Sequence, residues 1–329
     1  MKNHGEVMRM NRRAMLAALL WAALPARTAG QARPRVVYIA RSVGAVTRSW
    51  FAEQGFVDGR DVEIVAEALR GTTAAEMEPH ALEVIRSRPS VVLLLNWEPI
   101  LLFPRLTREI PLVFVNFGGD PVGMGLVQSL RRPGGNVTGS AQNLMSMTPK
   151  IFELLREFRP GGRRGGVLVK ESSLRARHMV QGQQEIARAG SLLGLEIGLI
   201  AVPDDPSVAG VRAALERTRV DYLFVTDDLH GNPVMPELVA YLERARIPAI
   251  YIVRQVVREG GLMSFTPDVA QGRRNAVEIA ARILRGENPA TIPVYQTDRY
   301  HVTINRKTAR AMGLPVSAAL LTRADEVVE

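Results

Sequence analysis

The chain has 329 residues, a formal net charge of +9 and no cysteine. Without cysteine, and with five histidines that show no ligand spacing, the sequence argues against a zinc site. The positive charge by itself would suit a nucleic-acid binder. However, the arginines are scattered and no basic run alternates with aromatic residues, so we expect no nucleic-acid partner.

Residues 1–32 have the layout of an export signal. A basic start precedes an apolar run over 14–24, and small residues follow. The run is too short to span a membrane, and no cysteine follows it to carry a lipid. Gly30-Gln31-Ala32 is the best cleavage site, and Arg12-Arg13 also resembles a twin-arginine signal. Without the signal, 37 Lys and Arg face 32 Asp and Glu, so we expect a periplasmic protein of modest positive charge.

After the signal, short apolar runs alternate with amphipathic stretches, which is the pattern of βα units. Strands are predicted at 36–40, 62–66, 91–95, 113–115, 167–169, 197–202, 222–225 and 249–252. Helices are predicted at 47–54, at 73–88 with Thr72 or Thr73 as cap, at 124–130, from Pro149 onward, and at 268–285 with Gly286 closing it. Roughly 297 residues exceed what one core usually organises, so we predict an α/β fold of two Rossmann-like lobes, each a parallel sheet flanked by helices.

The stretch 111–140, PLVFVNFGGDPVGMGLVQSLRRPGGNVTGS, reads as a strand, a polar loop, a short helix and an extended segment. Asp120 and Pro121 open the predicted helix. In open α/β sheets ligands bind beyond the carboxyl ends of the strands, so the loop 116–120 is predicted to contact one.

Two blocks of the chain resemble the ABC-transporter substrate-binding family, whose best-understood members resemble tryptophan-binding proteins. The first is GGDPVGMGLVQSLRRPGGNVTG, followed by Lys150 and IFELLREFRP. The second runs from IPAIYIVRQVVREGGLMSFTPD through RILRGENPATIPV and INRKTARAMGL to LLTRADEVVE. The two blocks keep the family's order over more than half of the chain that follows the signal.

This resemblance implies the type I periplasmic-binding fold, in which the chain crosses between the lobes three times. We expect the crossings near 137–140, 263–265 and 298–301. One lobe would then hold 33–139 plus 266–297, and the other 140–265 plus 298–329. Hinges of a few residues allow such lobes to close on a ligand.

Enzyme signatures are incomplete. Gly123-Met124-Gly125 lacks the third glycine of a dinucleotide fingerprint, because Gln128 stands in its place. Ser264 lies in GLMSF, which lacks the glycine that completes a nucleophile elbow. Asp227 and Asp228 fit an acid-base pair, a helix cap or solvated loop, or a partner for a ligand's ammonium group, and these readings stay open. We expect no catalytic residue, no metal and no cofactor.

The candidate ligand contacts share a position at a strand end or beside a crossing. They are Ser42, Asn96, Trp97, Asp120, Gln142, Asn143, Lys170, Asp227, Asp228, Tyr251 and Ser264. Trp97 and Tyr251 can supply ring walls for such a site. The loop around Asp120 matches the family's loop, whereas Asn96-Trp97-Glu98-Pro99 replaces the family's small Gly-Thr type of turn. Trp97 therefore either stacks on an aromatic ligand or fills that ligand's place.

The expected function is that of an exported, monomeric solute-binding protein that traps a small organic ligand and delivers it to an ABC permease. Characterised relatives imply an aromatic or other apolar amino acid. Its carboxylate would lie at Asn96 and the Asp120-Pro121 helix start, and its ammonium group at Asp227 or Asp228. The alternative is a periplasmic sensor that acts on a membrane kinase. An exported α/β enzyme is a third class, which turnover of the ligand would reveal.

Overall fold

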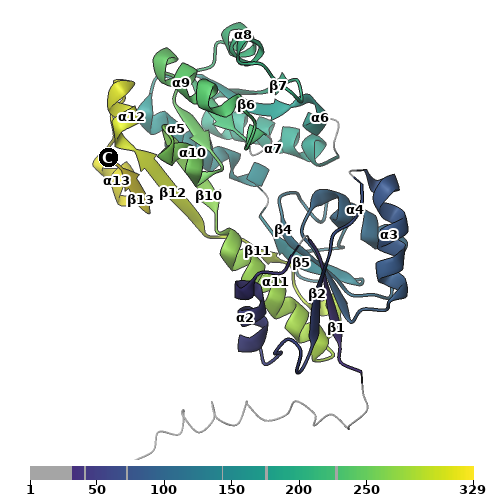
Figure 1. Cartoon of the computed structure of the whole chain (residues 1–329). Coiled ribbons are helices and arrows are strands. Elements are labelled where there is room, and N and C mark those ends of the chain that lie inside the picture. The colour runs from purple at the N-terminus through teal and green to yellow at the C-terminus, as the bar shows by residue number, and fades with distance from the viewer. Residues whose placement is uncertain (1–31, 41, 72, 143, 175–176, 227–228) are drawn as a thin grey trace, which may run out of the picture.

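The structure is a computed structural model that describes residues 32–40, 42–71, 73–142, 144–174, 177–226 and 229–329. It contains two β-sheets, each flanked by helices to form one α/β lobe. Three chain segments join the two lobes on one side (Figure 1). This confirms the predicted fold class. Within the described parts of the chain, no helix combines the length and the apolarity needed to cross a bilayer.

The first sheet consists of six strands that all pair in parallel. In spatial order they are β11 (Tyr295–Gln296), β5 (Val137–Ala141), β4 (Leu112–Phe117), β3 (Val91–Leu94), β1 (Arg35–Ile39) and β2 (Glu63–Glu67). One face packs on α2 (Ala45–Glu53) and α11 (Val269–Leu284), and the other on α3 (Ala74–Arg86) and α4 (Trp97–Leu106). A short 3₁₀ turn, η3 (Pro289–Thr291), leads into β11. Helices on both faces bury the central strand β3 completely, which explains its unbroken apolar sequence.

The second sheet has seven strands, which pair in parallel except β12 with β10. In spatial order they are β13 (Glu326–Val328), β12 (Tyr300–Asn305), β10 (Met263–Pro267), β9 (Ala249–Tyr251), β8 (Tyr222–Val225), β6 (Arg164–Lys170) and β7 (Glu196–Val202). One face is covered by α5 (Thr148–Phe158), α7 (Arg177–Leu193), α12 (Arg306–Ala311) and α13 (Ala318–Thr322). The other is covered by α8 (Val208–Thr218), α9 (Met235–Ala245) and α10 (Arg254–Arg258). The short elements η1 (Leu144–Met147) and α6 (Glu171–Leu174) belong to the same lobe.

Local sequence signals account for several element boundaries. Thr73 caps α3 and forms a capping box with Glu76, in which each side chain bonds the other residue's backbone N–H. Asp268 caps α11 by accepting a hydrogen bond from the N–H of Gln271 at 2.9 Å. Gly286, with φ +94°, follows the end of α11 as predicted.

The helix predicted over 124–130 is wrong. The chain forms turns there, in which the N–H groups of Leu126 and Val127 both bond the carbonyl of Pro121. Gly125 has φ +73°, a left-handed conformation that interrupts an α-helix. Gln128 then donates its N–H to Pro133 rather than to a residue one helical turn earlier. The loop after β4 therefore has no helix dipole at Asp120-Pro121.

The crossings between the sheets differ by a few residues from the predicted positions. Residues 137–140 belong to β5, and pairing with β11 keeps the strand in the first sheet as far as Ala141. The first crossing therefore begins at Gln142, and the prediction at 137–140 is wrong. The second follows β10 at Asp268, since β10 pairs with β9 and β12 in the second sheet. The third joins β11 to β12 over 297–299.

Tyr300 links the three crossings. Its ring stacks on Phe265 of β10, with centroids 4.7 Å apart and an 11° angle between the planes. Its hydroxyl lies 3.2 Å from the carbonyl of Gln142 and 3.3 Å from that of Thr297, and donates toward both. Burial raises the pKa of Tyr300 to about 12, so the hydroxyl keeps its proton at ordinary pH.

Replacing Tyr300→Phe should lower the free energy of unfolding by about 1 kcal/mol, because the ring stack remains while the hydroxyl's hydrogen bonds are lost. Thermal unfolding measured by circular dichroism should then show a fall in Tm of about 2–4 °C. Tyr241→Phe is the matched control, since in the described residues the Tyr241 hydroxyl has no hydrogen bond and its ring faces Arg212. Equal Tm values for the two variants would contradict the role of Tyr300.

Candidate ligand-binding site

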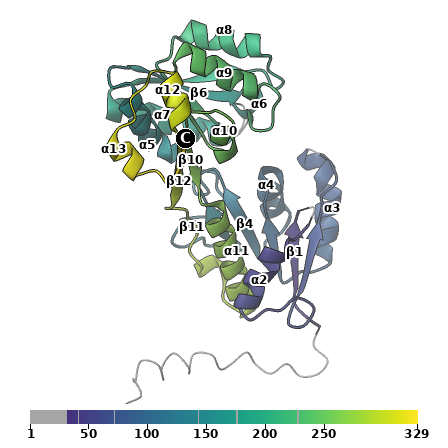
Figure 2. The same cartoon turned by 60° about the vertical axis from the view of Figure 1, so that its left-hand side comes forward.

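The carboxyl ends of both sheets face the region that the crossings join. β10 passes directly into α11 of the first lobe, and the parallel strands β9, β8, β6 and β7 end on the same side as β10. In the same way β5 ends at the first crossing, together with its parallel neighbours β4, β3, β1 and β2. Figure 2 shows the two lobes one above the other with this joining side in view. Loops after the strands are therefore the natural place for ligand contacts.

On the first lobe, the structure brings Asn96, Trp97 and the loop containing Asp120 together, because β3 and β4 are neighbours. Asn96 is the N-cap residue of α4, but its exposed side chain makes no capping hydrogen bond. Trp97 is half-buried against the core of the α3 and α4 face. Its ring borders Gly118, where an added Cβ would lie 3.8 Å from the ring. The loop after β4 therefore lies beside the indole.

Asp120 stabilises the loop that carries it. Its Oδ1 accepts the N–H of Val122 at 2.9 Å, and its carbonyl accepts the N–H of Met124. This is an Asx-type turn, which explains the turn-forming Asp-Pro pair. Ser42 is exposed in the segment between β1 and α2. The structure thus places both residues at strand ends, and Asp120 already has a structural role there.

On the second lobe, Lys170 is the half-buried last residue of β6. Thr226, at the end of β8, donates its hydroxyl to the carbonyl of Leu168 at 2.9 Å and fixes the adjacent strand ends. Asn143, Asp227 and Asp228 lie outside the described residues, so their role as ligand contacts stays a prediction. Gln142 is buried at the first crossing, and its carbonyl accepts from Tyr300.

Tyr251 is a core residue in this structure, which corrects its assignment as a ring wall. It is 2% exposed and lies with Leu242 and Val256 in the core that α8, α9 and α10 cover. Burial raises the pKa of its hydroxyl well above the ordinary value. Ser264 is its register partner on β10 and is fully buried, so it too lies inside the sheet rather than on a ligand-facing surface.

Sequence reasoning missed the residues that organise the joining side. Tyr300 and Phe265 form the stacked pair, and His301 places its Nε2 3.5 Å from the carboxylate of Asp268. The signal was weak, because β10 and β12 meet only through antiparallel pairing of distant segments. In the described residues, no group of three or more His, Asp or Glu side chains is placed to hold a metal ion.

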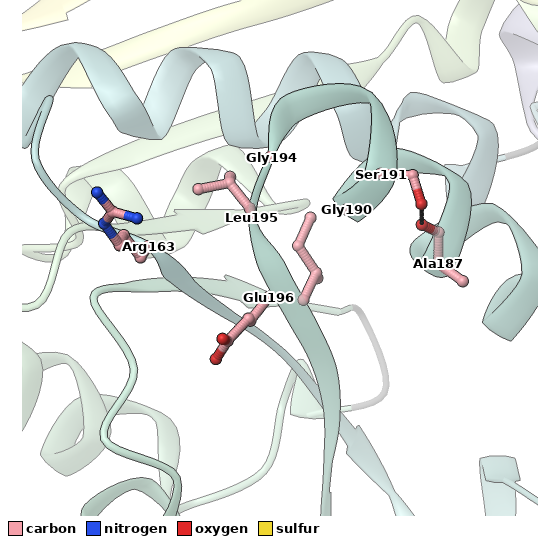
Figure 3. Close-up of a pocket in the computed structure, with 8 residues that line it drawn as sticks. Arg163, Ala187, Gly190, Ser191, Gly194, Leu195 and Glu196 are labelled. Atoms are coloured by element: carbon pink, nitrogen blue, oxygen red, sulfur yellow. Dashed lines mark hydrogen bonds between the residues drawn. The ribbon is translucent and has the colours of Figure 1, made fainter.

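A hollow of about 420 Å³ lies elsewhere, between the end of α7 and the start of β7. Figure 3 shows Arg163 and Glu196 on one side of it and Ala187 and Ser191 of α7 on the other. Because β6 and β7 begin here, the hollow is at the edge of the second sheet opposite to the strand ends described above.

The family follows from comparison with known sequences. The sequence model of the ABC transporter substrate binding protein family matches residues 103–328. The chain belongs to this family. A relative of this substrate-binding protein is the tyrosine-binding protein of Clostridioides difficile (strain R20291), 27% identical over 210 residues. The match covers 63% of this chain and 58% of that relative, less than two thirds of its length.

Solved structures share the fold of this substrate-binding protein. The ABC domain in complex with L-Trp from Streptococcus pneumonia has a TM-score of 0.72 at 21% identity, over 90% of this chain and 100% of that one. The ligand-free, open structure of CD0873, a substrate binding protein from Clostridium difficile, has a TM-score of 0.67 at 19% identity, over 90% and 99%. These likenesses show the type I periplasmic-binding fold and confirm the resemblance seen in the sequence.

Tyr251→Phe tests the buried position of this side chain. An ordinary tyrosine ionises near pH 10, so above that pH the unfolded chain loses the proton first and the free energy of unfolding falls as pH rises. The variant lacks this group and should lose stability less steeply from pH 10 upward, by as much as about 1.4 kcal/mol per pH unit. Urea unfolding at several pH values measures the slope. Tyr241→Phe, which removes the hydroxyl of a more exposed ring, should change the slope of the free energy of unfolding against pH less. Equal slopes for the wild type and Tyr251→Phe would contradict the buried position of Tyr251.

Proposed function

We propose that this substrate-binding protein traps a small organic ligand between the carboxyl ends of its two sheets and delivers it to an ABC permease. The observation that carries this proposal is the meeting of both sets of strand ends at one region, spanned by three short crossings. Two lobes with separate cores, joined only in this way, can close on a ligand by changes in a few hinge residues.

The ligand we propose is an amino acid with an aromatic or other apolar side chain. Trp97 supports this, since its half-buried ring lies at a strand end beside Gly118 and supplies an aromatic surface of the kind that stacks on a flat ligand. The tyrosine-binding protein of Clostridioides difficile is similar to this chain in sequence, and the ABC domain in complex with L-Trp is similar to it in fold. If the Trp97 ring itself fills the ring site, a small aliphatic acid or amide is the ligand instead.

The polar ends of the ligand need partners within a closed site. We assign the α-carboxylate to the start of α4, because the turns after Asp120 replace the helix that was expected there. Asn96 adds an uncommitted side-chain amide at that helix start, where anions are favoured. The ammonium group is assigned to Asp227 or Asp228, which follow Thr226 in the sequence. That assignment comes from the sequence.

We also propose that the chain is exported and works in the periplasm. The supporting observation is the sequence of residues 1–32, with its basic start, apolar run and small residues before the first strand. The mature protein would begin near Gln31 or Arg33, upstream of β1, so that processing would leave both lobes intact.

The ligand screen uses protein recovered from the periplasm of an expressing bacterium, with its first residue determined by N-terminal sequencing. Amino acids, their amides and simple carboxylic acids are added, and Tm is measured. An aromatic or apolar amino acid should raise the Tm, equivalent to about 2.7 kcal/mol at one hundred times its Kd. Stabilisation by a ligand without an amine, and by no α-amino acid, would contradict the amino-acid assignment.

Asp227→Asn and Asp228→Asn separate the two carboxylates. The substitution that neutralises the carboxylate holding the ammonium group should weaken amino-acid binding by about 1.5–3 kcal/mol, as measured by isothermal titration calorimetry. Glu216→Gln is the control, because Glu216 pairs with Arg212 on the surface of α8. If neither aspartate variant differs from this control, the ammonium partner lies elsewhere.

A further inference from the structure

The edge of the second sheet that faces away from the strand ends gathers loops from four βα units. The amino ends of β9, β8, β6 and β7 lie side by side there. Arg159 donates a guanidinium hydrogen bond to the carbonyl of Arg246, which ties the loop before β6 to the loop before β9. The carboxylate of Asp221 accepts the N–H groups of Arg163 and Arg164 at 2.8 and 3.0 Å. These bonds join three of the loops, and the N–H of Glu196 at the start of β7 bonds the carbonyl of Arg163 at 2.9 Å, which adds the fourth.

This surface is strongly basic. The loops and the last turns of the helices before them carry eight arginines, which we call the distal basic surface: Arg156, Arg159, Arg163, Arg164, Arg217, Arg219, Arg244 and Arg246. The acidic residues in the same segments are Glu157, Glu196, Glu216, Asp221 and Glu243. Eight arginines therefore face five carboxylates, and two of these, Glu157 and Glu216, pair with arginines outside the set. The formal excess of three compares with a net charge of +5 for the whole chain after residue 32.

Little of this positive charge is neutralised by ion pairs. In the described residues, Arg164 is the one member of the eight with a carboxylate partner, Glu196 at 3.4 Å. Arg156 donates instead to the carbonyl of Leu193 at 3.2 Å. Oδ2 of Asp221 accepts two backbone N–H groups, and Asp221 forms no ion pair with the eight arginines in the described residues. The remaining five guanidinium groups are exposed, have no ion pair or side-chain hydrogen bond in the described residues, and are available to an external anion: Arg163, Arg217, Arg219, Arg244 and Arg246.

Two of these arginines occupy backbone positions that favour glycine. Arg219 and Arg246 follow α8 and α9 with φ of 48° and 55°, the left-handed conformation of a helix C-terminal cap. An arginine there is strained where glycine is not. Arg88, with φ 48°, has the same conformation after α3 on the first lobe. It supplies a matched comparison away from the distal basic surface.

A large exposed apolar side chain lies at the same edge of the second sheet. Leu192, in the last turn of α7, is 69% exposed, and the next residue, Leu193, is the one whose carbonyl Arg156 binds. Arg163 lines the hollow of about 420 Å³ that this end of α7 borders (Figure 3). Cationic side chains flanking an exposed leucine are the combination with which peripheral proteins bind anionic bilayers.

We propose that the distal basic surface holds the mature protein at an anionic lipid bilayer. The arginines would contact headgroup phosphates, and Leu192 would reach the boundary between headgroups and acyl chains. This interaction is independent of the proposed ligand site, because the surface lies at the opposite edge of the second sheet. A protein held in this way keeps the region between its lobes accessible to a ligand.

The test is co-sedimentation of the mature chain with vesicles at low ionic strength. Vesicles of phosphatidylcholine with phosphatidylglycerol should retain the protein, and vesicles of phosphatidylcholine alone should not. Binding should disappear in about 0.5 M salt, since exposed charges are then screened within a few ångströms. Equal binding to both vesicle types, or to neither, overturns the proposal. Retention on heparin without vesicle binding overturns it as well and assigns the surface to another polyanion.

Glycine variants localise the binding without loss of folding. Arg219→Gly and Arg246→Gly each remove one charge and relieve the left-handed strain, so the Tm should stay equal or rise. Each should weaken vesicle binding about fivefold, the effect of one arginine near an anionic surface. Arg88→Gly makes the same exchange in the same conformation on the first lobe and should bind like the wild type. An equal loss in Arg88→Gly would show that net charge alone drives binding, which contradicts the proposal.

Discussion

The arrangement of the molecule depends on how the three crossings are held together. Each hydrophobic core cluster of the described residues belongs to one lobe, and none combines side chains from both. The lobes are therefore stabilised separately, and their relation rests on a few contacts at the crossings. Tyr300 provides the central ones, with its ring on Phe265 and its hydroxyl between two backbone carbonyls. Because burial raises its pKa, the hydroxyl remains a donor at more alkaline pH than an exposed tyrosine.

Much of this architecture could be predicted from the sequence, because strands buried on both faces read as apolar runs. The run at 222–225 coincides with β8, and the others differ by a few residues at their ends. The prediction of a helix at 124–130 was wrong, because Gly125 adopts a positive φ that the spacing of apolar residues does not reveal. The first crossing was misplaced because β11, only two residues long and more than 150 positions away, extends the pairing of β5. Such distant pairing leaves no local signal.

In the candidate site, too, features with a local sequence signal could be predicted and those set by distant packing could not. Residues at strand ends could be predicted, and Trp97 and the Asp120 loop meet because β3 and β4 are neighbours. The prediction that Tyr251 lines the site was wrong, because the sequence pattern of an aromatic residue at the end of a fully buried strand is the same whether its ring faces a helix or a ligand. The distal basic surface could not be predicted at all. Its arginines are scattered along the chain, and only parallel pairing of β9, β8, β6 and β7 brings them to one edge.

The central claim is that two separately folded lobes close about the three crossings when a ligand binds. Small-angle X-ray scattering of the mature protein, with and without a saturating ligand that raises its Tm, tests this most directly. The account predicts a smaller radius of gyration in the presence of the ligand, because closure brings the two sets of strand ends together. A ligand that stabilises the protein but leaves the scattering profile unchanged would contradict it.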